Sequence, residues 1–228
     1  MNVRRIGFLL AFIVATPAAA GDYLLLAGGE SADDAYYSYL GLIVTARADE
    51  NGRGFLQRYW LDHFGYEYDG GPGRIDARAH GGEAAIGYGG SSSRGWANVT
   101  IGLRFTDTEL APDDPAAKAH GSQTGVRLQL QGEREFAPAW RVGAIASLTS
   151  QQGEYWGRVR LTHGQTPAVS LGAELIAGGN DESESTAAGL LLILKPAASH
   201  WSVGFRAGAR RQDGDEGAYA GIELGYAF

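Results

Sequence analysis

Arginines and carboxylates at every second position are the side chains of this sequence best suited to chemistry. Nearly all the positive charge is arginine, because lysine occurs only at Lys118 and Lys195. The arginine guanidinium forms fixed, bidentate hydrogen bonds with carboxylates. If neighbouring strands enclose an interior, pairing of these charges from strand to strand would neutralise them there and fix the register of the strands. The same groups could instead line a path for a polar solute. The residues predicted to face this interior are Arg74, Asp76, Arg78, Arg104, Arg127, Glu133, Arg158, Arg160, Glu174, Arg206, Arg210 and Glu223.

If these segments are strands, four aromatic residues occupy alternate positions that could point to the same interior. They are Tyr37, Tyr39, Trp60 and Trp156. Flat aromatic faces in a polar interior could stack on sugar rings. The alternative is that these residues pack against neighbours or form an interfacial girdle.

Support for catalysis is weak. The histidines are scattered singly, without a His-x-x-x-His pair, and the chain has no cysteine, so a zinc site is not expected. Some acyl hydrolases place a serine and a histidine on a barrel wall, and Ser147 or Ser170 could in principle meet a histidine. However, His163 and His200 fall at predicted turns, and no nucleophile motif surrounds a serine. We therefore predict no catalytic, cofactor-binding or metal-binding residues. The histidines are His63, His80, His120, His163 and His200.

The elements that position these side chains are predicted to be strands with period-two alternation. In 200–211, for example, Phe205 and its alternate neighbours are apolar, whereas Arg206 lies on the opposite face. Most segments are near the roughly 9–11 residues that a tilted strand needs to span a membrane. An even number of strands places both termini on the periplasmic side. The pattern predicts an all-β fold, an antiparallel up-and-down transmembrane β-barrel of about 12 strands. The predicted strands are 22–29, 35–47, 54–68, 74–88, 94–106, 122–134, 139–150, 154–163, 168–178, 185–195, 200–211 and 218–228.

Two segments fit this pattern less well. In 54–68, Arg58 and Asp62 share a parity with Trp60, so no clean lipid-facing side emerges. In 74–88, the apolar face that begins at Ile75 would meet Glu83. The Gly81-Gly82 pair could host a β-bulge, which would move the following residues to the other face.

Both ends of the chain predict export to the outer membrane. Two arginines, a short apolar stretch and small residues ending at Ala20 predict a signal peptide over residues 1–20. The mature chain, 21–228, is then a single barrel domain. Its last ten residues alternate and end on Phe228, and Tyr226 with Phe228 resembles the assembly signal of outer-membrane proteins. The alternative is a soluble secreted or periplasmic β-protein.

Charge and loop lengths predict which rim faces outward. Connections after odd-numbered strands are long and acidic, whereas those after even-numbered strands are short, which places the acidic set outside the cell. Carboxylates such as Asp181, Glu182 and Glu184 could bind divalent ions among lipopolysaccharide headgroups, or be solvated loop charge. Without Arg4 and Arg5 the formal charge changes from -7 to -9, which argues against nucleic acid as a partner.

Short motifs connect the sequence to a known family. The run 109–115, Glu-Leu-Ala-Pro-Asp-Asp-Pro, is followed by Gly121 and Gly125 at the opening of a strand. With the Gly179-Asn180 turn and the closing Tyr-Ala-Phe, it resembles the cellulose biosynthesis protein BcsS family. The resemblance implies a small exported protein encoded with bacterial cellulose synthase components. It supplies no established set of catalytic residues to transfer.

These observations predict a non-enzymatic outer-membrane accessory of cellulose (exopolysaccharide) biosynthesis or secretion in a Gram-negative bacterium. It would act as a conduit or docking element whose interior contacts glycan. The expected partners are outer-membrane lipid and lipopolysaccharide, the barrel-assembly machinery, and cellulose or components of the cellulose synthase complex. One alternative is a generic small porin, and a further one is a lipid-modifying hydrolase.

Overall fold

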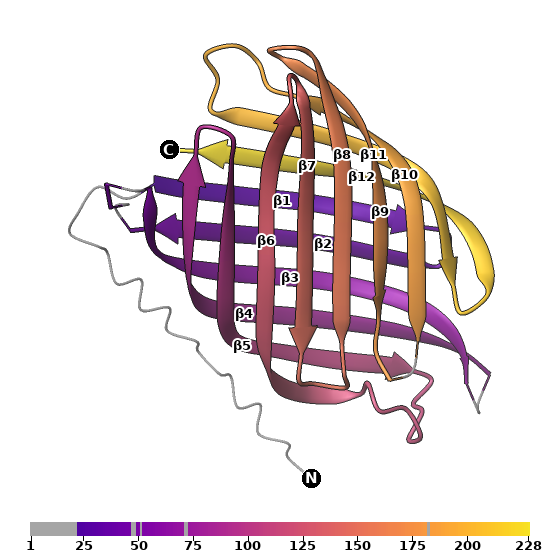
Figure 1. The fold of residues 1–228 in the computed structure, drawn as a ribbon. Coiled ribbons are helices and arrows are strands. Elements are labelled where there is room, and N and C mark those ends of the chain that lie inside the picture. The colour runs from indigo at the N-terminus through magenta and orange to yellow at the C-terminus, as the bar shows by residue number, and fades with distance from the viewer. Residues whose placement is uncertain (1–21, 47–48, 51, 71–72, 182) are drawn as a thin grey trace.

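The chain forms a closed, twelve-stranded antiparallel barrel, as predicted. The computed structural model describes residues 22–46, 49–50, 52–70, 73–181 and 183–228. The predicted signal peptide lies outside the described residues. Each strand pairs with its sequence neighbours, and β1 pairs with β12 to close the sheet (Figure 1). The strands are β1 (Asp22–Ala32), β2 (Ala35–Thr45), β3 (Arg53–Gly70), β4 (Gly73–Ser92), β5 (Gly95–Ala111), β6 (Gly121–Ala137), β7 (Trp140–Thr149), β8 (Tyr155–Thr166), β9 (Val169–Gly179), β10 (Glu184–Leu194), β11 (Trp201–Gln212) and β12 (Asp215–Ala227).

Alternation along each strand separates an apolar exterior from a polar interior. In β11, Phe205 is 44% exposed whereas the adjacent Arg206 is 8% exposed. Leu175 in β9 is 64% exposed beside a fully buried Glu174. Because hydrocarbon surrounds the wall of a membrane barrel, exposed leucine and phenylalanine outside and buried charge inside are the expected arrangement.

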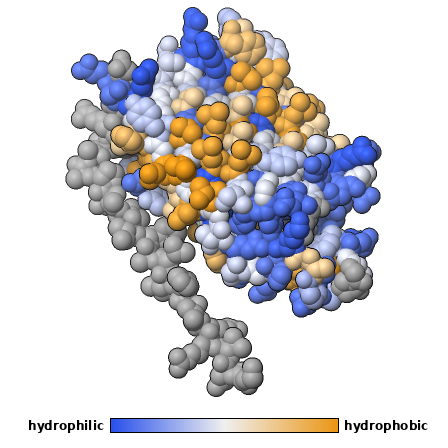
Figure 2. Space-filling view, turned by 60° about the horizontal axis from the view of Figure 1, so that its bottom comes forward, coloured by the Kyte–Doolittle hydropathy of each residue, from blue (hydrophilic) through white to orange (hydrophobic). Residues whose placement is uncertain are grey.

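The outer wall carries an apolar surface. Figure 2 shows hydrophobic residues gathered in the middle of one face, with hydrophilic residues to either side. On β4 and β5, Ile86 is 67% exposed and Leu103 is 63% exposed. None of the described residues belongs to a helix long and apolar enough to cross a membrane.

Four consecutive strands are longer than the rest. β3, β4, β5 and β6 contain 17 to 20 residues, whereas the other eight contain 10 to 13. The start of β1 and the end of β12 lie together, and we call this the periplasmic end because both termini of such barrels lie there. The opposite, extracellular end therefore carries the β3–β4 and β5–β6 connections. The four long strands extend further at that end than the other eight, and we call this extension the raised wall. The segment 107–111, predicted to be loop, belongs to β5 because it pairs with β4.

The predicted bulge at Gly81-Gly82 is wrong, and so is the side assigned to the residues before it. The register of β4 with β3 and β5 is continuous, so no residue changes face. Ile75, Ala77 and Ala79 are therefore inside the barrel, with no exposed surface. Arg74, Asp76 and Arg78, predicted to face the interior, instead share the outer face with Ile86.

The polar and apolar sides are exchanged at the start of β4 because this part of the strand extends beyond the membrane. The outer face of the raised wall meets water, so charge is stable there. Arg74 donates to Glu67 at 2.5 Å and Arg78 to Asp76 at 2.8 Å, and the hydrogen bond to Glu67 raises the pKa of Arg74. Inside the wall, the β5–β6 connection covers the apolar residues: Asp114 is buried and accepts a hydrogen bond from Tyr68 at 3.3 Å.

Candidate lumen site

Charged residues on the β3–β6 wall form one connected group inside the barrel. Arg104 pairs with Asp62 through two hydrogen bonds of 2.8 and 3.2 Å, and Arg58 pairs with Glu83. Arg127 lies 3.7 Å from Glu83. Three arginines face three carboxylates, so the group is formally neutral, which a buried set of charges requires. This first lumen cluster comprises Arg58, Asp62, Glu83, Arg104, Arg127 and Glu154.

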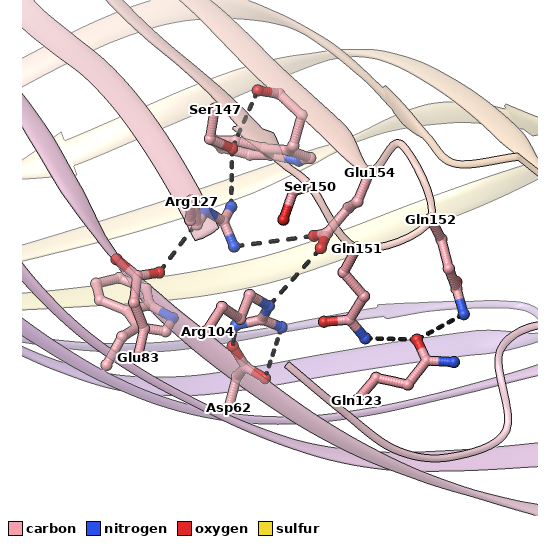
Figure 3. A network of polar contacts seen from close by, with 12 residues as sticks. Asp62, Glu83, Arg104, Gln123, Arg127, Ser147, Ser150, Gln151, Gln152 and Glu154 are labelled. Carbon is pink, nitrogen blue, oxygen red and sulfur yellow. Dashed lines mark hydrogen bonds and ion pairs between the residues drawn. The ribbon is translucent and has the colours of Figure 1, made fainter. Parts of the chain in front are cut away.

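Glu154 joins this cluster from the extracellular β7–β8 connection. Its carboxylate lies 3.7 Å from Arg104 Nε and 3.8 Å from Arg127 Nη1, between the two guanidinium groups (Figure 3). Arg127 also donates to the Ser147 hydroxyl at 2.8 Å. The cluster therefore reaches from the barrel wall to the extracellular mouth.

The opposite wall, from β8 through β12 to β1, holds a second group. Glu223 accepts hydrogen bonds of 2.7 Å from both Arg158 and Arg160. Glu174 accepts from Arg160 and from the hydroxyl of Tyr219, each at 2.9 Å. Again three arginines face three carboxylates. This second lumen cluster comprises Glu30, Arg158, Arg160, Glu174, Arg206 and Glu223.

Many of these pairs join strands that are not neighbours. Arg158 on β8 reaches Glu223 on β12, and Arg206 on β11 reaches Glu30 on β1 at 2.8 Å. The contact between Arg158 and Glu223 has three strands between its members and must cross the interior, whereas that between Arg206 and Glu30 spans only β12. The cavity that Arg160, Arg206 and Glu223 border has a volume of only about 10 Å³, near the space for one water molecule.

Aromatic side chains on β2 and β3 lie between the two clusters. Tyr39 stacks on Trp60 with ring centres 4.6 Å apart, and Trp60 donates to the Tyr37 hydroxyl at 3.1 Å. The guanidinium of Arg58 lies 4.4 Å from the centre of the Trp60 ring. On β8, Arg158 lies 5.5 Å from the Trp156 ring. The faces of these rings are thus engaged by protein groups, as in the packing alternative.

Extracellular connections meet over the mouth of the barrel. The carbonyl of Lys118 accepts hydrogen bonds from Gln123 at 2.6 Å and Gln152 at 2.8 Å. The backbone of Asp181 donates to the Gln152 carbonyl at 3.0 Å, and its carboxylate lies 3.9 Å from Lys118. The β5–β6, β7–β8 and β9–β10 connections therefore form one hydrogen-bonded cover.

The structure divides the twelve predicted interior residues into three groups. Seven contribute to the two clusters, and three are on the outer face, as described above. Glu133 and Arg210 belong to neither cluster: Glu133 pairs with Arg141 near the periplasmic end, and Arg210 donates to Gln212 near the extracellular end. The seven are Arg104, Arg127, Arg158, Arg160, Glu174, Arg206 and Glu223.

Sequence reasoning missed part of each cluster. Arg58 and Asp62 looked like breaks in the pattern of their strand, although Phe55 and Leu61, of opposite parity, are 72% and 48% exposed and form its lipid face. Tyr219, which donates to Glu174 of the second cluster, has the parity of Glu223 and could have been found from that. Glu154 has the parity of Trp156 and Arg158 in the predicted strand 154–163 and could have been found from that, although in the structure it lies in the connection just before β8.

The terminal residues and the serines have structural partners. Phe228 stacks on Tyr23 with ring centres 5.2 Å apart, and Tyr226 contacts Trp201 at 4.6 Å, where β12 meets its neighbours. Ser147, weighed as a nucleophile, accepts from Arg127 and donates to the Trp156 carbonyl at 3.4 Å. The described part of the chain brings no three His, Asp or Glu side chains together in a way that could hold a metal ion.

The closed sheet, apolar wall and polar interior define the protein as an outer-membrane β-barrel. Residues 24–228 match the family of cellulose biosynthesis protein BcsS. The chain therefore belongs to the BcsS family, and the resemblance seen in its sequence is confirmed. No curated protein matches the sequence.

Solved structures with a similar fold are outer-membrane barrels. The KdgM porin has a TM-score of 0.51 and 12% identity, covering 90% of this chain and 99% of its own. The COG4313 outer membrane channel from Pseudomonas putida F1 has a TM-score of 0.59 and 13% identity, covering 94% and 97%. The β domain of the Bordetella autotransporter BrkA has a TM-score of 0.56 and 14% identity, covering 92% and 100%. At these identities the likeness concerns the fold alone.

Proposed function

We propose that this protein is a non-enzymatic accessory of cellulose production that docks other components at the outer membrane through a barrel with a closed lumen. The observation that carries the proposal is the set of ion pairs between non-neighbouring strands, such as Arg158 with Glu223. A glucan chain could pass only if these pairs separated, and separating buried pairs is costly. Family membership supports the link to cellulose, and the cross-braced interior favours docking over conduction.

Export and assembly follow from the two ends of the chain. We infer that residues 1–20 are a signal peptide removed near Ala20, and that the mature barrel sits in the outer membrane of a Gram-negative bacterium among lipopolysaccharide. Tyr226 and Phe228 serve as the signal for the barrel-assembly machinery. The docking partners are cellulose or components of the cellulose synthase complex.

The absence of catalysis rests on the surroundings of the candidate nucleophile. The Ser147 hydroxyl is held by Arg127 and a backbone carbonyl, which supports a structural role, because a serine nucleophile is activated by a base within hydrogen-bond reach. Mass spectra of lipid A from cells with and without the protein would differ if it were a lipid-modifying hydrolase. We expect identical spectra.

Deletion of the gene tests the assignment to cellulose production. We expect less extracellular cellulose in the deletion strain, restored by the wild-type gene. As a matched control, a gene encoding the Glu216→Gln variant, altered at an exposed carboxylate on the extracellular rim, should restore cellulose equally. Unchanged cellulose in the deletion strain would contradict the proposal.

A small solute porin is the second candidate. One solved structure with a similar fold is that of the KdgM porin in complex with disordered oligogalacturonate. The lumen of this chain combines arginines with amide and aromatic groups, which could contact a saccharide. Planar-bilayer conductance, measured with and without cello-oligosaccharides, separates the two candidates. A steady open current that these sugars leave unchanged would favour the porin.

A further inference from the structure

Arg104 and Arg127 have hydrogen-bonding capacity that the protein itself leaves unused. Both side chains are largely buried, with 5% and 11% exposure. The Nε atoms of both residues are buried without a hydrogen-bond partner. The Nε of Arg104 lies 3.7 Å from Glu154, whereas the Nε of Arg127 lies 3.7 Å from Glu83 and Arg127 faces Glu154 through Nη1. Buried donors are normally satisfied, so each exception calls for an explanation. The two guanidinium groups face Glu154 together (Figure 3).

Glu154 fills the space between the two arginines only loosely. Its oxygens lie 3.7 and 3.8 Å away, whereas Asp62 binds Arg104 at 2.8 Å. Charge-assisted N–H···O bonds have lengths of about 2.7–2.9 Å, so Glu154 supplies charge without forming a hydrogen bond. Its side chain is 34% exposed, unlike those of the buried Asp62 and Glu83 at 1%. Rotation of this one side chain toward solvent would open the position.

The connection that carries Glu154 is held to the barrel separately from that carboxylate. Ser150 exchanges two hydrogen bonds of 2.9 Å with the backbone of Val126. The loop also packs closely over Gly125, where an added Cβ would lie 2.9 Å from the Gln151 Cβ. The Glu154 carboxylate is therefore not needed to keep the loop in place.

Amide groups of the same connection border the position. Gln151 donates to Gln123 at 2.7 Å, but its own side-chain oxygen is buried without a hydrogen-bond partner. Gln152 also donates to Gln123, at 2.7 Å. A hydroxyl group is the donor that a free amide oxygen accepts from. The unpartnered N–H donors and the Gln151 oxygen therefore match a ligand that places an anionic oxygen beside the arginines and a hydroxyl beside Gln151.

We propose that Arg104 and Arg127 form a binding subsite for the carboxylate of an acidic saccharide, and that Glu154 occupies this subsite until the ligand displaces it. One carboxylate replaces another, so the first lumen cluster stays neutral when the ligand binds. Saccharide hydroxyls complete the hydrogen bonding of Gln151. The subsite lies at the extracellular end, so the ligand arrives from outside the cell. The inference goes beyond the proposed function, because cellulose carries no carboxylate and the acidic saccharide is therefore a further ligand.

Titration of the purified mature protein with trigalacturonate and with cellotriose tests the proposal. Glu154→Gln removes the internal competitor, so we expect it to bind trigalacturonate about tenfold more tightly, the equivalent of one charge-assisted hydrogen bond. Arg127→Gln should bind it about tenfold more weakly on the same grounds. Binding of the uncharged cellotriose should be the same in all variants. Glu184→Gln, altered at an exposed carboxylate on the extracellular rim, is the matched control and should bind like the wild type.

Two outcomes would overturn the subsite. One is a Glu154→Gln variant that binds trigalacturonate no more tightly than the wild type, and the other is an equal gain for both sugars. Folding of each variant is checked by heat-modifiable gel mobility, and Glu154→Gln alone decides if Arg127→Gln does not fold. A gene deletion that lowers cellulose while the purified barrel shows no preference for the carboxylate would overturn this inference and leave the proposed function standing.

Discussion

Glu174 shows how a single carboxylate holds the interior together. Its side chain has no exposed surface and contacts Arg160 at 2.9 Å, Arg206 at 3.6 Å and the Tyr219 hydroxyl at 2.9 Å. These partners come from three other strands. Gly189 makes room for them, because a Cβ there would lie 2.2 Å from the Tyr219 oxygen.

Glu174→Gln should therefore destabilise the barrel strongly. The change leaves Arg160 and Arg206 short of one negative charge in a buried site, which costs about 3–5 kcal/mol. The free energy of unfolding in detergent, from urea titration, measures this. Glu216→Gln, at the exposed rim, is the control and should change stability by less than about 0.5 kcal/mol. A similarly small loss in Glu174→Gln would show that the pairing is not stabilising.

At this scale the sequence predicts which residues are charged and lie inside, but not their partners. Glu223 pairs with Arg158 and Arg160, which are 65 and 63 positions away. Strand alternation predicts only the side of the sheet on which a residue lies. It does not predict which residue it contacts across the lumen. Alternation in the predicted strand 154–163 gives Glu154 the same side as Arg158 and Arg160, but only the folded connection brings it to Arg104 and Arg127.

At the scale of the strands, the period-two pattern predicted all twelve elements but misassigned part of one. The pattern reports which side of a strand is apolar, and in a membrane span the apolar side faces lipid. Above the membrane the outer side faces water, so the sides of Arg78 and Ile75 are reversed. What covers Ile75 is a connection whose position depends on tertiary contacts such as that of Asp114 with Tyr68.

The two environments on the outer face of β5 can be compared directly. Leu103 and Glu109 have the same parity, but lie about 20 Å apart along the strand at roughly 3.3 Å per residue. Leu103→Arg places a charge against acyl chains and should cost about 2–4 kcal/mol. Glu109→Arg, on the raised wall, should cost far less. Unfolding in lipid vesicles measures both, and equal costs would contradict the assignment of the membrane-facing part.

Phe228 lies where β1 and β12 meet, and its replacement tests whether it has a role beyond packing. Phe228 and Tyr23 exchange two backbone hydrogen bonds of 2.9 and 3.0 Å, and their rings stack. Loss of the stack in Phe228→Ala should cost about 0.5–1.5 kcal/mol in purified protein.

If Phe228 is also an assembly signal, cells should accumulate much less of the Phe228→Ala variant in the outer membrane than this modest loss explains. Phe228→Tyr keeps an aromatic ring and serves as the control. Quantitative blots of outer-membrane fractions, set beside refolding yields in detergent, separate the two roles. Normal accumulation of Phe228→Ala would restrict Phe228 to packing.

For the whole molecule, the decisive property is that two obstacles lie in series along the lumen. The hydrogen-bonded cover, with its contacts to Lys118, lies at the extracellular mouth, and the ion pairs of Glu223 with Arg158 and Arg160 lie deeper. Resistances in series add, so removing one obstacle leaves the other to limit the current. The wild-type barrel should therefore conduct little.

Three variants test this arrangement in planar bilayers. One replaces residues 113–119 by a short Gly-Ser turn, the second carries Arg158→Ser with Glu223→Ser, and the third combines both changes. We expect small increases in current from the first two and an increase in the combined variant well above their sum, because only there is the path continuous. A large steady current through the wild-type barrel would contradict the closed lumen, and additive increases would show that the two obstacles lie on separate paths rather than in series.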